Sequence, residues 1–214
     1  MMQLNFSTFF DSSQLDGYLG GVMNYEYDGV LCHKSPIDMA IYLRLLSDRR
    51  PRSIIEIGSM FGGSALLLRD FAAMLHLDCE LVSIDLDPPN LGSKAHGIRF
   101  IAGDAHDLNV VFAAYSLDKL ARPWLLIEDS AHTFSACTAV LQFCAKHLLP
   151  GEFLVMEDGV LDELGLKEKY DGGPNRAVGD FLSDSPGVFV VDRFYCDMFG
   201  RNATFNPNGY LRRV

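Results

Sequence analysis

The chain has 214 residues, of which 49% are hydrophobic and 21% are charged, and its formal net charge at pH 7 is −10. This length and hydrophobic content can bury one large core, so we expect one principal domain. The negative charge would repel a phosphate backbone, which argues against DNA or RNA as a substrate. Because the chain begins without a basic segment and contains no apolar run of membrane-spanning length, we expect a cytoplasmic protein that does not act at a membrane.

Residues 1–33 are rich in aromatic residues and glycine and show no clear periodicity. We expect this segment to be a cap over a binding site or an interface between subunits of a homo-oligomer. The alternative is a segment that packs on the flank of the domain. Residues 34–214 are expected to form the domain itself, beginning with a helix at residues 36–46, where Pro36 stands in the first turn.

Strand patterns then alternate with helix patterns along most of the chain. The expected strands are residues 53–58, 81–85, 98–102, 124–127 and 153–156, and the expected helices are residues 63–75, 108–120 and 134–148. Such alternation predicts an α/β fold whose mostly parallel sheet has helices on both faces. Towards the end, residues 188–191 are an expected strand, and in residues 204–211 the turn signal at 206–209 is expected to stand between two edge strands, which predicts an antiparallel C-terminal edge.

The first strand leads into a glycine-bearing turn, Gly58-Ser-Met-Phe-Gly-Gly63. A dinucleotide fold would have a second glycine where Met60 stands, and a phosphate-binding P-loop would have Lys-Ser or Lys-Thr after the glycines. Glu56, at the end of the strand, would repel a pyrophosphate but suits a cationic ligand. These features predict S-adenosylmethionine (SAM), which has a sulfonium charge and no phosphate.

Two further acids end the next two strands. Asp85 is placed to accept hydrogen bonds from both ribose hydroxyls, and Asp104 from the adenine amino group. The alternative is that Glu56 and Asp85 only interact with water at the strand ends, and that the glycines serve a turn. The order of strand, acid, glycines and second acid favours SAM.

Four carboxylates follow the fourth and fifth expected strands, namely Glu128, Asp129, Glu157 and Asp158. Parallel strands end at the same edge of a sheet, so these groups should converge near the cofactor. A divalent cation would relieve their repulsion, and oxygen ligands favour Mg²⁺, Mn²⁺ or Ca²⁺ over Zn²⁺. Partnering by arginine, or simple exposure, is the alternative.

His132 stands three residues after Asp129 and can face the same cleft if a helical turn begins there. In that position it is a candidate general base, and the alternative is a capping or packing residue.

These residues together resemble a class I SAM-dependent methyltransferase. More narrowly, the chain resembles the metal-dependent family of cephalosporin hydroxylase and methoxylation proteins, rhamnosyl O-methyltransferases and macrolide-sugar O-methyltransferases. The matching segments are 55–58, 62–65, 83–85, 103–104, 129–132, 155–158, 173–174, 177–178 and 206–211.

The resemblance implies that Asp129, Glu157 and Asp158 bind Mg²⁺ or Mn²⁺ and that His132 deprotonates the acceptor hydroxyl. Ala131 departs from the pattern, because relatives often have a second acid there, and either Glu128 or Asp129 could be the ligand. The expected cofactor contacts are Glu56, Gly58, Gly62, Ser64, Asp85 and Asp104.

The sequence therefore predicts a Mg²⁺-dependent SAM O-methyltransferase acting on a hydroxyl of a small molecule, such as a sugar-bearing natural product. Asp129 and His132 would be its catalytic residues. A catechol-like or other phenolic acceptor is an alternative, as is a non-catalytic partner protein with the same fold. An NAD-dependent oxidoreductase would share the fold but is disfavoured by Met60.

Overall fold

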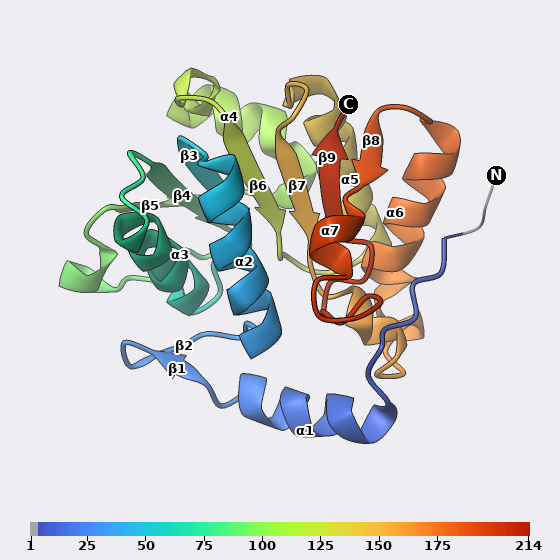
Figure 1. Ribbon diagram of the computed structural model, residues 1–214. Helices are drawn as coiled ribbons and strands as arrows, with labels where there is room; N and C mark the ends of the chain where they lie inside the picture. Colours follow the sequence, from blue (N-terminus) through green and yellow to red (C-terminus); the bar gives the residue numbers. More distant parts are fainter. Residues whose placement is uncertain (1–3) are drawn as a thin grey trace.

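The computed structural model describes residues 4–214 as a sheet with helices on both faces and a small N-terminal substructure beside it (Figure 1). The helices are α1 (Ser12–Val22), α2 (Pro36–Arg49), α3 (Gly63–Met74), α4 (Leu108–Tyr115), α5 (Phe134–His147), α6 (Gly173–Asp184) and α7 (Arg193–Cys196). The strands are β1 (Glu26–Tyr27), β2 (Val30–Leu31), β3 (Ser53–Ile57), β4 (Glu80–Asp85), β5 (Ile98–Ala102), β6 (Trp124–Glu128), β7 (Phe153–Met156), β8 (Phe189–Val191) and β9 (Tyr210–Arg213).

The main sheet has seven strands in the order β5-β4-β3-β6-β7-β9-β8. Strands β3 to β7 are all parallel to one another, and β9 is antiparallel to both β7 and β8. The predicted α/β fold, with a mostly parallel sheet and an antiparallel C-terminal part, is therefore confirmed. The chain leaves β3 towards β4 on one side and later returns to β6 on the other, which makes a crevice at the carboxyl ends of these strands.

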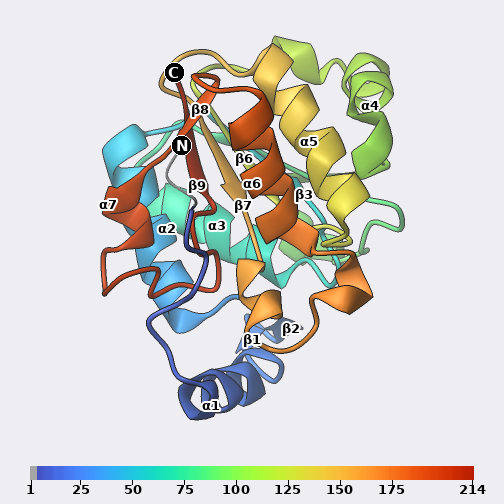
Figure 2. The ribbon, with the colours of Figure 1, turned by 90° about the vertical axis from the view of Figure 1, so that its right-hand side faces the viewer.

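The sheet separates two hydrophobic cores. Successive side chains of a strand point to opposite faces, so Ile54 packs with α2 and α3 while Ile55 and Ile57 pack with α4, α5 and α6. Figure 2 shows α4, α5 and α6 together on one side of the sheet and α2 and α7 on the other. Burial on both faces explains why the central strands are continuous apolar runs.

The N-terminal segment is more regular than its sequence suggested. Asp11 and Gln14 form a reciprocal capping box that begins α1. The β1–β2 hairpin follows, and its turn residues Asp28 and Gly29 both have positive φ. Both elements lie beyond the carboxyl ends of the parallel strands (Figure 1). In the part of the chain described, no helix combines the length and the apolar character needed to cross a membrane.

The prediction of two edge strands around the turn at 206–209 was wrong in its first half, because only Tyr210–Arg213 is a strand. Before the turn, the Thr204 hydroxyl and the Phe205 amide both donate to the buried carboxylate of Asp38 in α2. The backbone there is therefore tied to a helix terminus and does not join the sheet.

Candidate active site

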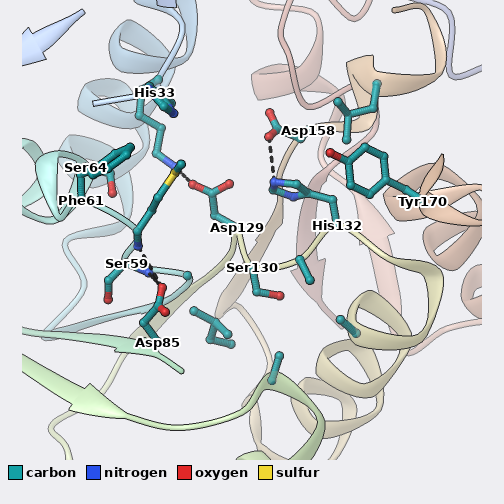
Figure 3. A pocket seen from close by; sticks show the side chains of 18 of the residues that line it. His33, Ser59, Phe61, Ser64, Asp85, Asp129, Ser130, His132, Asp158 and Tyr170 are labelled. Carbon is teal, nitrogen blue, oxygen red and sulfur yellow. Dashed lines mark hydrogen bonds and ion pairs between the residues drawn. The ribbon is translucent and has the colours of Figure 1, made fainter. Parts of the chain in front are cut away.

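A cavity of about 770 Å³ opens at the carboxyl ends of the parallel strands (Figure 3). It is lined by the segments that follow β3, β4, β5, β6 and β7, and also by α1 and the turn between β7 and α6. The cavity thus lies at the edge of the sheet where the sequence predicted the site residues.

The glycine turn, residues 58–63, joins β3 to α3 against the end of β6. Gly58 has a φ of 103°, and a Cβ atom on it would lie 2.0 Å from the backbone oxygen of Asp129. A Cβ on Gly63 would lie 2.2 Å from the Leu31 oxygen. Only glycine fits such approaches, so the turn needs glycine for close packing as well as for its conformation. Gly58 lines the cavity, whereas Gly62 stands just outside it as the N-cap of α3.

Glu56 lies beneath the cavity and does not line it. Its carboxylate is fully buried and accepts from the hydroxyls of Ser64 at 2.5 Å and Ser83 at 2.6 Å. Burial raises the pKa of Glu56, and the nearby Lys34 and the two hydroxyls oppose that shift. Ser64 does line the cavity. Glu56 thus fixes the first turn of α3 from below.

Asp85 lines the cavity and also orders the glycine turn. Its Oδ2 accepts from the amides of Ser59 at 2.8 Å and Met60 at 2.9 Å. Asp104 lines the cavity too, and it accepts from the backbone amide and from Nδ1 of His106, both at 2.9 Å. The backbone hydrogen bond from His106 lowers the pKa of Asp104. Both carboxylates stand where a polar ligand could reach them.

The acid cluster, defined here as Asp129, Glu157 and Asp158, follows β6 and β7. Ligand atoms of Asp129, Asp158 and His132 all lie within 4.8 Å of one another, and His132 Nε2 is 3.3 Å from Asp158 Oδ2 (Figure 3). His132 and Asp158 have φ values of 55° and 59°, in the left-handed region that side chains other than glycine rarely adopt. Asn206 holds Asp158 in this conformation, because its Oδ1 accepts from the Asp158 amide at 2.9 Å.

Glu157 is buried and is bonded on both of its oxygens. Lys34, whose side chain is only 2% exposed, donates to Glu157 Oε2 at 2.6 Å and also to Asp129 Oδ2. The Tyr42 hydroxyl donates to Glu157 Oε1. Burial disfavours the ammonium form of Lys34, but the carboxylates of Asp129 and Glu157 outweigh burial and raise its pKa. Lys34 is therefore a charged group inside the acid cluster.

Of the two neighbouring acids at the end of β6, Asp129 lines the cavity and Glu128 does not. Glu128 is 1% exposed, accepts from Ser130 through Oε1, and has no partner at Oε2. Burial raises its pKa to about 7. Arginine does not partner these acids in the described structure, since Arg122 pairs with Glu152 and Arg176 with Asp171.

The remaining wall of the cavity is apolar. It is formed by one side of α1 and by the turn between β7 and α6, with Phe205 behind them. Its side chains are Leu19, Val22, Met23, Val160, Leu161, Leu164, Leu166 and Phe205. Tyr170 stands at the border, with its ring edge-on to His132 at 5.9 Å (Figure 3).

Several lining or contacting residues were missed from the sequence. Lys34 and Tyr42 carry no motif that marks them, because their partner Glu157 is distant in the chain. His106 stands only two residues after Asp104, but no motif marks it either. For α1 a signal did exist, since Asp11 and Gln14 have the spacing of a capping box.

Comparison with known proteins gives concordant results over most of the chain. The family described as Rhamnosyl O-methyltransferase/CmcI matches residues 20–214. Rhamnosyl O-methyltransferase of Mycobacterium leprae (strain TN) is 28% identical over 191 residues, which cover 86% of this chain and 81% of that protein. Rhamnosyl O-methyltransferase of Mycobacterium tuberculosis (strain ATCC 25618 / H37Rv) is 25% identical, with 87% of this chain and 77% of that protein covered.

Among solved structures, the one described as "cmcI-D160 Mg-SAM" has a TM-score of 0.70 with this fold at 26% sequence identity. It covers 90% of this chain, and 77% of its own chain is matched. A second, described as "CmcI-N160 apo-structure", gives the same values. The sequence matches and the structural match thus each cover between 86% and 90% of the chain.

Proposed function

Because the chain belongs to the Rhamnosyl O-methyltransferase/CmcI family, we propose that its cavity transfers the SAM methyl group to a hydroxyl of a small molecule with the help of Mg²⁺. The broader statement, that the chain is a SAM-dependent methyltransferase, follows from the family and the fold. The observation that carries the finer proposal is the convergence of Asp129, His132 and Asp158 beside the glycine turn.

The glycine turn and the acids at the ends of β4 and β5 are proposed to bind SAM. Asp85 and Asp104 line the same cavity as Gly58, so one elongated ligand could contact all three. Glu56 would contribute from beneath, by holding Ser64 in place. This arrangement supports an adenosine moiety at Asp85 and Asp104 and a reactive end that lies towards Asp129.

The donor set fits a divalent cation, because two carboxylates and one imidazole bring ligand atoms within 4.8 Å of one another. We propose that Asp129 and Asp158 hold Mg²⁺ or Mn²⁺, since oxygen ligands suit these ions. When bound, the cation would lower the pKa of the acceptor hydroxyl. Glu157 as a third ligand stays a prediction, and both of its oxygens already accept hydrogen bonds from Lys34 and Tyr42.

His132 is proposed to take the proton from the acceptor hydroxyl. Its Nε2 lies 3.3 Å from Asp158, whose carboxylate would stabilise the imidazolium that forms. The Tyr170 ring packs edge-on against the imidazole and restricts its orientation. With two carboxylates assigned to the cation, the imidazole is left to act as a base.

The apolar wall supports an acceptor that carries an apolar part next to its reactive hydroxyl. Burying such a part against Val22, Leu161 and Phe205 would contribute binding energy and exclude water from the reaction. Relatives named for rhamnosyl groups favour a sugar-bearing natural product as the acceptor class.

The proposal is tested with the wild-type protein, SAM and a panel of rhamnosides and other glycosides of apolar alcohols. We expect S-adenosylhomocysteine (SAH) to form with at least one acceptor in the presence of Mg²⁺, and turnover to fall at least about 100-fold in EDTA. Binding of SAH, measured by calorimetry without any acceptor, is the control for a folded cofactor site. Turnover that is unaffected by EDTA would contradict the role of the metal.

A further inference from the structure

The proposed reaction assigns no role to Lys34. It comes from the segment between β2 and α2, and its ammonium group lies inside the acid cluster. Its two partners follow β6 and β7, so the contact joins three separate parts of the chain. A buried ammonium group is costly unless it is paired, and here two carboxylates pair with it.

The acid cluster carries more negative charge than Lys34 can neutralise. The three carboxylates of the acid cluster carry three negative charges when ionised, and Lys34 compensates one of them. A divalent cation at Asp129 and Asp158 would then lie close to a fixed positive charge that shares the Asp129 carboxylate. Two like charges at such range repel strongly in a buried site.

We propose that Lys34 is a positioning residue that acts as an internal counter-cation and competes with the divalent cation for Asp129. The inference rests on the proposed function for the presence of a metal site, and it concerns how tightly that site binds. Lys34 holds the acid cluster together in the absence of metal and keeps its affinity for the metal low. Metal binding in this chain is therefore weaker than it would be without the charge of Lys34.

Tyr42 provides the matched comparison within the same cluster. The Tyr42 hydroxyl donates to the Glu157 oxygen that Lys34 does not contact. Unlike the Lys34 ammonium group, this hydroxyl is uncharged. Tyr42→Phe removes one hydrogen bond from the cluster and changes no charge. If the charge of Lys34 is what weakens metal binding, losing the Tyr42 hydroxyl should have a much smaller effect.

The test is a titration with Mn²⁺ in the absence of SAM and acceptor, following free Mn²⁺ by electron paramagnetic resonance. We expect Lys34→Met to bind Mn²⁺ at least about tenfold more tightly than wild type, because the competing charge is gone. Lys34→Arg, which keeps the charge, and Tyr42→Phe should stay within about threefold of wild type. Equal or weaker binding by Lys34→Met would overturn the proposal.

Lys34→Met leaves Asp129 and Glu157 without their counter-charge, so its fold can be weakened. Thermal melts with and without Mn²⁺ keep the proposal testable in that case. The expected result is a larger Mn²⁺-induced rise in Tm for Lys34→Met than for wild type, and a smaller or equal rise would contradict it. The proposed function is tested separately by the binding of SAH to the wild type, measured by calorimetry. The two Mn²⁺ experiments do not include the cofactor, so either proposal can fail without the other.

Discussion

The glycine turn and the acid cluster share one cavity but are built in different ways. The turn is made from consecutive residues, and two of its amides donate to a single carboxylate, that of Asp85 at the end of the neighbouring strand. The acid cluster is assembled from distant segments, and Lys34 bonds across 95 residues to Asp129 and across 123 residues to Glu157. The turn is thus fixed by local geometry, whereas the cluster is fixed by compensation of charge.

The two regions should respond differently to mutation. Substitutions in the acid cluster should lower turnover and leave the affinity for SAH unchanged, provided that the cluster keeps its fold. Changes in the turn should act on the fold itself, because Gly58 packs directly on the backbone of Asp129. The contact at Gly58 is also where the two regions meet, so it can be used to test whether they are separable.

The largest effect is expected for His132→Gln in the acid cluster region. Loss of the base should lower kcat by about 10²- to 10⁴-fold, while the glycine turn stays unchanged. Turnover is measured as SAH formation, and SAH affinity by calorimetry should stay within about threefold of wild type. Retention of kcat within tenfold would show that another group takes the proton.

Gly58→Ala breaks the junction between the two regions. The added Cβ would meet the Asp129 carbonyl at 2.0 Å, and the φ of 103° disfavours alanine as well. We expect a loss of about 3 kcal/mol in the free energy of unfolding, measured by urea denaturation.

Gly17→Ala in α1 is the matched control for that variant. A Cβ at Gly17 would meet nothing within 4 Å, so this change should be neutral or stabilise by up to about 1 kcal/mol. Equal effects of the two substitutions would mean that the close approach at Gly58 has no energetic importance.

A smaller, pH-dependent effect is expected at Glu128, which is buried beside the acid cluster. Its folded-state pKa of about 7 lies above the usual 4.5, so the folded protein holds a proton that the unfolded chain releases between these values. The stability contributed by this group is therefore lost as pH rises from about 4.5 to about 7. Glu128→Gln has no such proton to hold, and at pH 8 it should exceed wild type by about 1–3 kcal/mol.

Urea unfolding of wild type and Glu128→Gln at pH 5 and pH 8, both in EDTA, measures that difference. Other groups titrate equally in the two proteins, so only the change in the gap between them is interpreted. A gap that does not widen with pH would mean that Glu128 is ionised in the folded state.

The local part of the site could be predicted from sequence. The glycine turn, Asp85, Asp104 and the acids after β6 and β7 were expected at one edge of a parallel sheet, and the structure has them at that edge. Their placement at one edge follows from the parallel direction of the strands, which alternation of strands and helices implies. Their roles in binding and catalysis stay predictions, as do the homo-oligomer and the separate role of residues 1–33.

What could not be predicted depends on side-chain direction and on long-range contacts. Glu56 was expected to face the ligand, but strand alternation turns it towards Ser64 and Ser83, opposite to Ile55 and Ile57. Lys34 gave no sign of burial, because a lone lysine is normally exposed. Only the folded positions of Asp129 and Glu157 explain it.

The most direct test of the account is Asp129→Asn, which keeps the size of the side chain and removes one charge from the acid cluster. SAH binding and Mg²⁺-dependent turnover are to be measured on the same preparation. The account predicts SAH affinity within about threefold of wild type and a loss of turnover of at least about 100-fold. Near-normal turnover, or an equal fall in SAH affinity and turnover, would contradict the division of the cavity into a cofactor site and a separate acid cluster.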